Sequence, residues 1–374
     1  MKEVLKMLVL AVFLLIGNAC TEASISIGGE GAGGSDPTEQ GVPLNVKNLG
    51  LSVEVESRSI VTGGPVSGAA NPNPLIEVGL CVTKRSNSGV VGLYAGGRNK
   101  LLYTYNTAAS PAAWEPSAGE EPLMLYSDIG TVYGFWPAEK SVSLSGNPKV
   151  PVMSSVRVLD KQKFYFHDGG NPVDIPADVQ WDTDQDDFLY GVAPQPVDRW
   201  APEVSLSLRH ALAKVSFRIL EANTGTELVG CGVSKVVLKS SGGFKKSTSA
   251  KLNLSTGELS GTVTAVDQLS FTADGDIRAI GTHVSDAAGV AVQAFGLVIP
   301  VEDVPATLEL TLDDGRIFTM APAADGSTPS TFTADWEKGN NYIYDIRMLP
   351  QGIEIADIQV AGWEDGGITG IPVE

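Results

Sequence analysis

The segment SLRHALAKVSFRI, from Ser207 to Ile219, decides how the fold of this chain is interpreted. Apolar and polar residues alternate on both sides of its centre, but the alternation changes phase by one residue around residues 209–212. Since successive side chains of a β-strand point to opposite faces, such a phase change indicates a bulge or a switch between two sheets. We therefore predict β-structure with a corner at this point. The apolar positions are Val204, Leu206 and Leu208 before the change, and Ala213, Val215, Phe217 and Ile219 after it.

His210 lies at the predicted corner, where it could be a ligand or a structural residue. A metal site would need further ligands at suitable spacing. The only other histidines are His167 and His283, and no histidine has a metal-type spacing to a cysteine or to another histidine. We interpret His210 as a side chain that forms hydrogen bonds at a bend, and we predict no metal site and no cofactor.

Almost every segment beyond residue 45 has the pattern of a short strand. Alternating or continuous apolar runs are separated by Gly, Pro, Asn and Asp, and long amphipathic helices are absent from the pattern. Asp314-Gly315 indicates a two-residue hairpin, and Thr256-Gly257 and Gly63-Gly64 indicate further turns. Many short strands in a chain of 374 residues predict an all-β protein with two β-sandwiches. The predicted strands are residues 49–57, 75–83, 90–93, 101–105, 123–125, 131–136, 164–166, 204–208, 215–219, 233–238, 251–254, 294–299, 307–312, 341–348 and 353–360.

The net charge of the chain is −18. Binding to nucleic-acid phosphates requires clustered Lys and Arg, so a nucleic-acid partner is excluded. An acidic surface is compatible with a protein outside the cytoplasm.

The N-terminus has the organisation of an export signal. Lys2 and Lys6 precede an apolar run at residues 7–16, which is too short to span a bilayer. Gly17-Asn18-Ala19-Cys20 follows, and the small residue before Cys20 resembles a bacterial lipobox, in which the cysteine is lipidated and becomes the first mature residue. The alternative is a plain signal peptide with an incidental cysteine.

Residues 21–43 are rich in Gly, Ser, Glu and Asp, a composition that cannot bury a core. We predict a signal peptide at residues 1–19, a flexible tether at 20–45, an N-terminal sandwich at 46–200 and a C-terminal sandwich at 201–374. The inner boundary, around residue 200, is placed within the Pro-rich residues 193–202, because proline interrupts strand pairing.

Two cysteines remain after Cys20, and both occur in strand-like runs. Cys81 and Cys231 are too few for a disulfide framework. We predict buried thiols, with a bridge between them as the alternative.

Motifs for catalysis are missing from the sequence. There is no G-x-S-x-G, no H-E-x-x-H and no cysteine beside an identifiable histidine, so an enzyme is not predicted. The acidic run at residues 182–187 resembles a calcium loop, but Asp187 and Ala193 occupy positions where an EF-hand needs Gly and Glu. A solvated acidic loop is the preferred interpretation.

Several motifs, taken in order, resemble those of the fimbrillin family of Bacteroidetes, the pilin subunits of surface fimbriae. The resemblance extends from about residue 50 to the C-terminus. Phe135-Trp136 stands where the family has a Tyr pair, and Asn340 where Lys is common. The matching segments are YGFWP (133–137), DFLYG (187–191), RHALAKV (209–215), LVIP (297–300) followed by LEL (308–310) and DG (314–315), WEKGNNYIY (336–344) and the closing residues 353–363.

The resemblance implies two transthyretin-like sandwiches, export as a lipoprotein to the outer membrane and cell surface, and polymerisation by strand exchange. A protease would remove the first strand, and a strand of the next subunit would fill the groove. Arg58, which follows the first good strand, is our predicted processing site, with Lys47 and the region of Arg85 as rivals.

The donor strand would come from the C-terminal region. Residues 353–360 are one candidate and residues 367–374 (GITGIPVE) are another. Ile368 and Ile371 are badly spaced for one face of a strand, and Pro372 restricts the segment to an edge.

We predict a fimbrial subunit that contributes to adhesion, whose partners are other fimbrial subunits, the outer membrane through a lipid, and host or bacterial surface ligands. Stalk, tip, anchor and minor subunit remain open. The alternative is a monomeric surface lipoprotein that binds glycan or peptide, for which Tyr94, Trp114 and Tyr126 are candidate aromatic platforms.

Overall fold

The computed structural model describes most of the chain beyond residue 39, and no helix in that part is long and apolar enough to cross a bilayer. The described residues contain 25 strands and one short 3-10 turn, η1 (Ala95–Gly97), which confirms the predicted all-β class. The described ranges are 40–51, 65, 74–86, 89–167, 180–220, 228, 230–275, 277, 280, 292–322, 330–349, 352–362 and 369–371.

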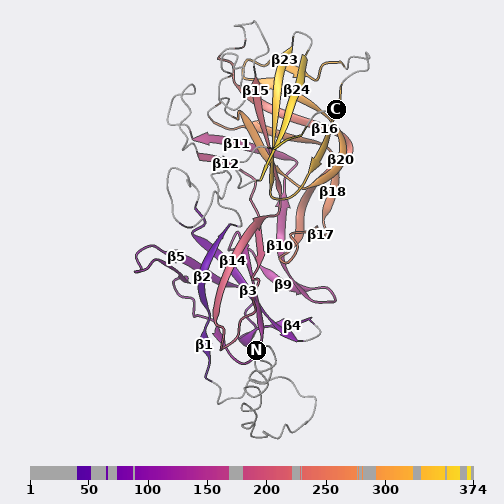
Figure 1. Cartoon of the computed structure of the whole chain (residues 1–374). Coiled ribbons are helices and arrows are strands. Elements are labelled where there is room, and N and C mark those ends of the chain that lie inside the picture. The colour runs from indigo at the N-terminus through magenta and orange to yellow at the C-terminus, as the bar shows by residue number, and fades with distance from the viewer. Residues whose placement is uncertain are drawn as a thin grey trace, which may run out of the picture. The chain divides into compact units, whose positions relative to one another are not determined.

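An eight-stranded sheet holds strands from the first part of the chain together with one strand that follows residue 200 (Figure 1). The sheet curls so that its first strand, β2 (Asn45–Leu51), lies close to its last, β6 (Ala113–Pro116). Trp114 Nε1 of β6 donates a hydrogen bond to Leu49 O of β2 at 3.3 Å. A separate two-stranded ladder joins β1 (Val42–Pro43) to β7 (Met124–Leu125). The order of the eight-stranded sheet is β2 (Asn45–Leu51), β14 (Glu203–His210), β13 (Leu189–Val192), β8 (Gly130–Trp136), β3 (Glu77–Ser86), β5 (Leu101–Asn106) and β6 (Ala113–Pro116), with β4 (Gly89–Leu93) paired to β3.

A ten-stranded sheet is organised around β16 (Val233–Asn253), the longest strand of the described chain. The first part of β16 pairs with β20, whereas its second part pairs with β10, which precedes it by about 80 residues in the chain. The other strands are β9 (Val142–Ser145), β10 (Val150–Val158), β11 (Lys161–His167), β12 (Gln180–Thr183), β17 (Leu259–Ser260), β18 (Val263–Ala273), β20 (Val301–Leu312), β21 (Ile317–Thr319) and β22 (Phe332–Trp336).

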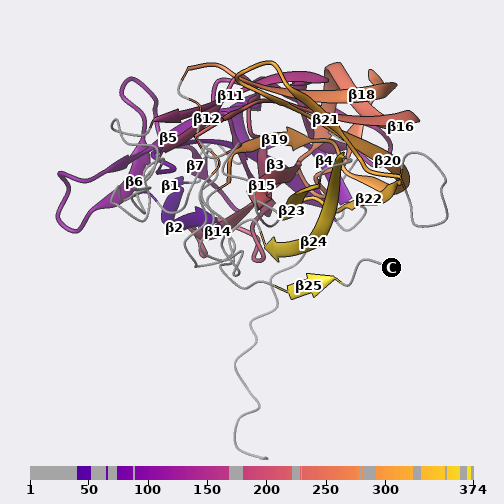
Figure 2. The same cartoon turned by 90° about the horizontal axis from the view of Figure 1, so that it is seen from above.

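A five-stranded sheet completes the fold, with β25 at its edge beside β24 (Figure 2). Its order is β19 (Ala294–Val298), β15 (Ala213–Leu220), β23 (Asn340–Leu349), β24 (Gly352–Gly362) and β25 (Thr369–Ile371).

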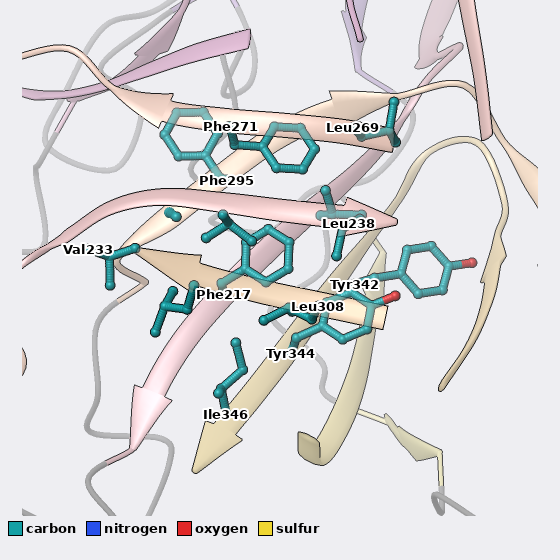
Figure 3. Packing of buried hydrophobic residues seen from close by; sticks show 14 of the residues in the cluster. Phe217, Val233, Leu238, Leu269, Phe271, Phe295, Leu308, Tyr342, Tyr344 and Ile346 are labelled. Carbon is teal, nitrogen blue, oxygen red and sulfur yellow. The ribbon is translucent and has the colours of Figure 1, made fainter. Parts of the chain in front are cut away.

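The largest apolar core lies between the five-stranded and ten-stranded sheets (Figure 3). Phe217 of β15 stacks on Tyr344 of β23 with ring centroids 5.5 Å apart, and its ring also lies 5.9 Å from that of Phe271 on β18. Burial of such side chains contributes about 1.5–3 kcal/mol each to the free energy of unfolding. These aromatic residues therefore hold the two sheets face to face as a sandwich.

A second apolar cluster joins the eight-stranded sheet to the other two. Cys81 and Phe135 of the eight-stranded sheet belong to the same buried cluster as Met153 of β10, Leu252 of β16 and Leu297 of β19. Since strands of all three sheets share this core, residues 40–374 form one compact unit. The division into domains near residue 200 stays a prediction.

The predicted switch between sheets at residues 209–212 is confirmed. Strand β14 ends at His210 in the eight-stranded sheet, and β15 begins at Ala213 in the five-stranded sheet. Ala211 N donates to Phe188 O and Gly339 N donates to Leu212 O, each at 2.8 Å, so the corner is held from both sides.

One charged pair is buried on β15 and its neighbours. Arg218 donates to both carboxylate oxygens of Asp345 at 2.6 and 3.0 Å, and Gln359 of β24 donates to the same carboxylate at 2.9 Å. A bidentate pair with a third donor satisfies the carboxylate, which is the condition under which buried charges are tolerated.

Most predicted strands are present, with three corrections. Strand β2 begins at Asn45 rather than residue 49, and residues 52–57 lie outside the described ranges, as do Gly63 and Gly64. The two strands predicted at 233–238 and 251–254 are parts of the single strand β16, whose register shifts between Lys239 and Phe244. Glycine and serine interrupt the alternation there without ending the ladder.

The third correction concerns the hairpin at Asp314-Gly315, whose loop has three residues instead of two. Thr311 is paired with Ile317, and Leu312 N donates to Arg316 O at 2.9 Å, which leaves residues 313–315 in the loop. Gly315 has a φ of +86°, a conformation that favours glycine. The turn at Thr256-Gly257 is confirmed, since Gly257 N donates to Asn253 O at 2.8 Å.

The two cysteines differ in environment. Both are free thiols, but Cys81 is buried, whereas Cys231 is only partly buried and its Sγ accepts a hydrogen bond from Arg316 at 3.1 Å. The prediction of a buried thiol is therefore right for Cys81 and wrong for Cys231. Burial raises the pKa of the Cys81 thiol to about 12.

These environments predict selective alkylation. At pH 8 and in the folded state, iodoacetamide should modify Cys231 and leave Cys81 unmodified, because Cys81 is inaccessible and fully protonated. Peptide mass spectrometry of protein treated with and without denaturant measures both sites. Equal labelling of the two thiols in the folded protein would contradict the assignment.

Candidate functional site

The candidate site is the edge strand β2 with the groove that it fills. Among the described strands, β2 forms a ladder with β14 alone, and the two strands run parallel. Leu44, Val46 and Leu49 are at most 4% exposed and belong to the core of the eight-stranded sheet. Each contributes about 1.5–3 kcal/mol by burial, so β2 is held mainly by its side chains.

A bulge explains the spacing of these inward side chains. Val46 is paired with Val204 and Asn48 with Ser205, so Lys47 is an extra residue on β2. Val46 and Leu49 therefore reach the same core although they are three positions apart in the sequence.

Polar contacts fix the register of β2. Asn45 N donates to Pro202 O at 2.9 Å, and Asn48 Nδ2 donates to Ser205 Oγ at 3.4 Å. Lys47 Nζ lies 2.6 Å from a carboxylate oxygen of Glu203, but about half of each side chain is exposed, so this ion pair contributes little. These polar contacts set the register of β2 but contribute little to the free energy that holds it in the groove.

Two buried aromatic side chains bond to the backbone of β2 from the opposite wall. Tyr103 Oη donates to Leu44 O at 3.4 Å, and Trp114 Nε1 donates to Leu49 O at 3.3 Å. Burial raises the pKa of the Tyr103 hydroxyl to about 12, so it remains a neutral donor. Both donors bond to the backbone, and they could therefore bond to another strand in the same place.

Two glycines shape the floor below β14. Gly134 and Gly191 face each other on β8 and β13. A Cβ at Gly134 would lie 2.3 Å from Leu206 and 2.8 Å from Leu208, the inward residues of β14. These glycines belong to the YGFWP and DFLYG segments, so part of those motifs serves close packing behind the groove.

An open cleft of about 840 Å³ runs along β2. It is bordered by residues 47–51 of β2, by Tyr105 and Trp114 on one side, and by Tyr190 and Arg209 on the other. This strand is thus accessible from solvent along part of its length.

His210, the residue at the corner, has the structural role predicted for it. Its side chain is 1% exposed, and Nδ1 lies 2.8 Å from a carboxylate oxygen of the equally buried Asp187. The pair connects β14 to the residues that precede β13.

In the acidic run at residues 182–187, each carboxylate that the structure describes contacts a different partner. Asp184 Oδ1 accepts a hydrogen bond from Lys163 N at 2.7 Å, Lys140 Nζ lies 2.9 Å from Asp186, and Asp187 contacts His210. They are therefore not arranged around a common point, as a calcium loop requires.

The structure does not cover every residue predicted from the sequence. Cys20 and Arg58 lie outside the described residues. Tyr94 and Trp114 are 2% and 4% exposed, so as aromatic platforms for a sugar they were wrongly predicted. Aromatic residues occur on both the buried and the exposed faces of strands, and the sequence pattern does not show on which face a given aromatic residue lies.

The C-terminal segment has the spacing seen in β2. The inward residues here are Leu44, which directly precedes β2, and Val46 and Leu49 of β2, at intervals of two and three. Read in the reverse direction, Val373, Ile371 and Ile368 have the same intervals. The spacing of Ile368 and Ile371 is therefore compatible with the positions that β2 occupies. From the sequence alone this spacing was judged unsuitable, because a bulge leaves no signal in the alternation of apolar and polar residues.

Comparisons with known proteins place this fold in a family. A family model described as fimbrillin-like matches residues 77–363, which is most of the chain. The chain therefore belongs to the fimbrillin-like family, a class of fimbrial, cell-surface structural proteins. A search of curated protein sequences gives no match.

Solved structures from Bacteroides and Parabacteroides species are similar to this chain. They include a candidate cell adhesion protein of Bacteroides uniformis, at 16% identity over 86% of this chain and 99% of that one, with a TM-score of 0.49. A fimbrial protein of Bacteroides vulgatus is 13% identical over 76% of this chain and 92% of that one, with a TM-score of 0.39. A fimbrial assembly protein of Parabacteroides distasonis is 11% identical over 88% of this chain and 100% of that one, with a TM-score of 0.36.

The close packing at Gly134 yields a stability prediction. Gly134→Ala should lower the free energy of unfolding by about 1–3 kcal/mol, because the added Cβ overlaps the buried side chains of Leu206 and Leu208, which must move within a packed core. Gly50→Ala on β2 is the matched control, since a Cβ there meets no atom within 4 Å. Denaturant unfolding of both variants measures the difference, and equal stability of the two would contradict the packing argument.

Proposed function

We propose that this fimbrial subunit is exported as a lipoprotein through Cys20 and assembles with other fimbrial subunits by exchange of strand β2. The observation that carries the proposal is that β2 is an edge strand whose inward side chains complete a core. Removal of β2 would expose Val204, Leu206 and Leu208 together with one unpaired edge of β14. An apolar groove beside a free edge binds an extended segment of suitable spacing.

The free energy of burial favours replacement of β2 by another strand over a groove that is left empty. Leu44, Val46 and Leu49 together contribute about 5–9 kcal/mol of burial at roughly 1.5–3 kcal/mol each, which is comparable with the stability of a whole domain. A subunit without β2 would therefore be destabilised until another strand occupies the groove.

Processing at Arg58 would release β2. Of the rival sites, Lys47 is the bulged residue of β2, whereas Arg85 lies inside β3 and is paired with Val90. Ladder hydrogen bonding protects a backbone from proteolysis, which argues against Arg85 as the site.

The C-terminal segment is the proposed donor. Val373, Ile371 and Ile368 would occupy the positions of Leu44, Val46 and Leu49 if the donor runs antiparallel to β14. In the described chain, β25 contains Ile371 and pairs only with β24 at the edge of its sheet, so its release would disrupt one short ladder.

A second candidate function is that of a monomeric surface lipoprotein that binds a glycan or a peptide. The cleft beside β2 favours it, because Tyr105, Tyr190 and Arg209 border an open volume of about 840 Å³. Adhesion to host or bacterial surface ligands is compatible with both candidate functions, the fimbrial subunit and the monomeric binder.

The mature N-terminus tests processing. In cells that assemble the fimbria, we expect the surface form to begin at Ser59 and to give heat-labile multimers on an unboiled denaturing gel. Arg58→Ala should accumulate the uncleaved monomer, whereas Arg85→Ala should be processed like the wild type. A lipidated Cys20 on a single monomer band would instead support the monomeric binder.

A disulfide lock tests the exchange of β2 itself. Asn48 and Ser205 are paired neighbours on β2 and β14, within the range of distances that a disulfide bridges. Asn48→Cys with Ser205→Cys, in a Cys231→Ser background, should abolish the multimers under oxidising conditions and restore them with dithiothreitol. The single variant Asn48→Cys is the control, and undiminished multimers in the locked protein would refute the exchange of β2.

A further inference from the structure

Four apolar side chains are exposed on β4, on β7 and on two loops that adjoin the eight-stranded sheet. Trp200 is 72% exposed, Ile129 49%, Val91 44% and Met124 36%. We call this surface the basal face, and Figure 1 shows β1 and β4 at this end of the sheet. Exposed apolar residues gathered in one place mark a contact surface more often than scattered ones do.

Backbone contacts connect the parts of the basal face. Arg85 N, next to the β3–β4 hairpin, donates to Ile129 O at 2.9 Å. Gly130 forms a bridge with Val197, and Arg199 N donates to Tyr126 O at 2.9 Å. Backbone hydrogen bonds thus join the segments that carry Trp200, Ile129 and Val91.

Trp200 is presented on a fixed turn. Asp198 Oδ1 accepts hydrogen bonds from Trp200 N and Ala201 N, both at 2.8 Å. The guanidinium of Arg199 lies 5.5 Å from the centre of the indole ring. A fixed turn loses little conformational entropy when its aromatic residue is buried by a partner.

The charge of the basal face differs from that of the chain. Lys84, Arg85, Lys149 and Arg199 flank the exposed apolar residues, against the carboxylates Asp128 and Asp198. Asp128 is paired with Lys84 at 2.6 Å, and Asp198 bonds to the amides of the turn. Cationic side chains thus border the exposed apolar residues, although the net charge of the chain is −18.

The N-terminal chain joins the fold at this face. Val42 pairs with Leu125 and Pro43 with Met124, and a Cβ at Gly41 would lie 3.1 Å from Met124 Cβ. The 21 residues from Cys20 to Gln40 can span at most about 70 Å, since an extended chain covers about 3.3–3.6 Å per residue. A chain lipidated at Cys20 would thus hold the basal face close to a bilayer at a high effective concentration.

We propose that the basal face docks on the phospholipid surface in the uncleaved, membrane-anchored subunit. The docking rests on the proposed lipidation of Cys20. The indole of Trp200 enters the headgroup region with Ile129 beside it, where tryptophan is favoured because its ring is apolar and its N–H is polar. Arg85 and Arg199 bind lipid phosphates through charge-assisted hydrogen bonds. The interaction orients the subunit, while the lipid holds it.

The test uses the full chain, purified with its lipid and reconstituted in phosphatidylcholine–phosphatidylglycerol vesicles. Half of the vesicles carry lipids brominated near the headgroup, which quench nearby tryptophan. The wild type should be quenched, and Trp200→Phe should lose this quenching. Ile317→Ser, which removes an exposed aliphatic residue of β21 outside the basal face, is the matched control and should be quenched like the wild type.

The outcomes separate docking from anchoring. Intact mass shows whether Cys20 carries acyl chains, and an unmodified chain overturns both the lipoprotein assignment and the docking. An acylated chain with equal fluorescence in brominated and ordinary lipid overturns the docking alone. A third outcome is that Trp200 becomes shielded from solvent only at high protein density and is not quenched by brominated lipid. This would assign the basal face to contacts between copies of the chain and would also overturn the proposal.

Discussion

The passage of the chain from one sheet to another between His210 and Ala213 is the constraint on which the rest of the structure depends. Strand β14 directs its inward residues into the core of the eight-stranded sheet, and β15 directs its own into the sandwich of the other two sheets. A single short segment therefore serves two cores. The buried contact of His210 with Asp187 and the backbone bonds of Ala211 and Leu212 hold the corner.

This constraint explains why β2 can be the variable part of the sheet. Strand β14 is held on one side by β13 and at its end by the corner, so its position does not depend on β2. The backbone donors Tyr103 and Trp114 and the space above Gly134 and Gly191 are likewise provided by other strands. The groove that β2 fills is thus lined by residues of other strands, as the proposed exchange of β2 requires.

The interior also contains a polar arrangement that no apolar pattern specifies. Arg218, Asp345 and Gln359 come from three adjacent strands of the five-stranded sheet, and the first and last donate hydrogen bonds to the Asp345 carboxylate. Replacement of a single partner in such a group leaves a buried charge uncompensated, whereas the intact group is tolerated. Its geometry fixes the register of β15, β23 and β24, because a shift by one residue would separate the partners.

The sequence by itself determined the all-β class, the position of most strands and the corner at His210, because the period of two and its change of phase are local properties of a strand. It also determined the order of motifs by which the family was recognised. Tertiary structure alone decided that β10 pairs with the second half of β16, since strands with the same alternation are interchangeable as partners. It also decided that Lys47 is bulged and that Trp200 is exposed while Trp114 is buried. These features depend on which surfaces meet after the chain has folded, and contacts between residues distant in the sequence leave no local pattern to read.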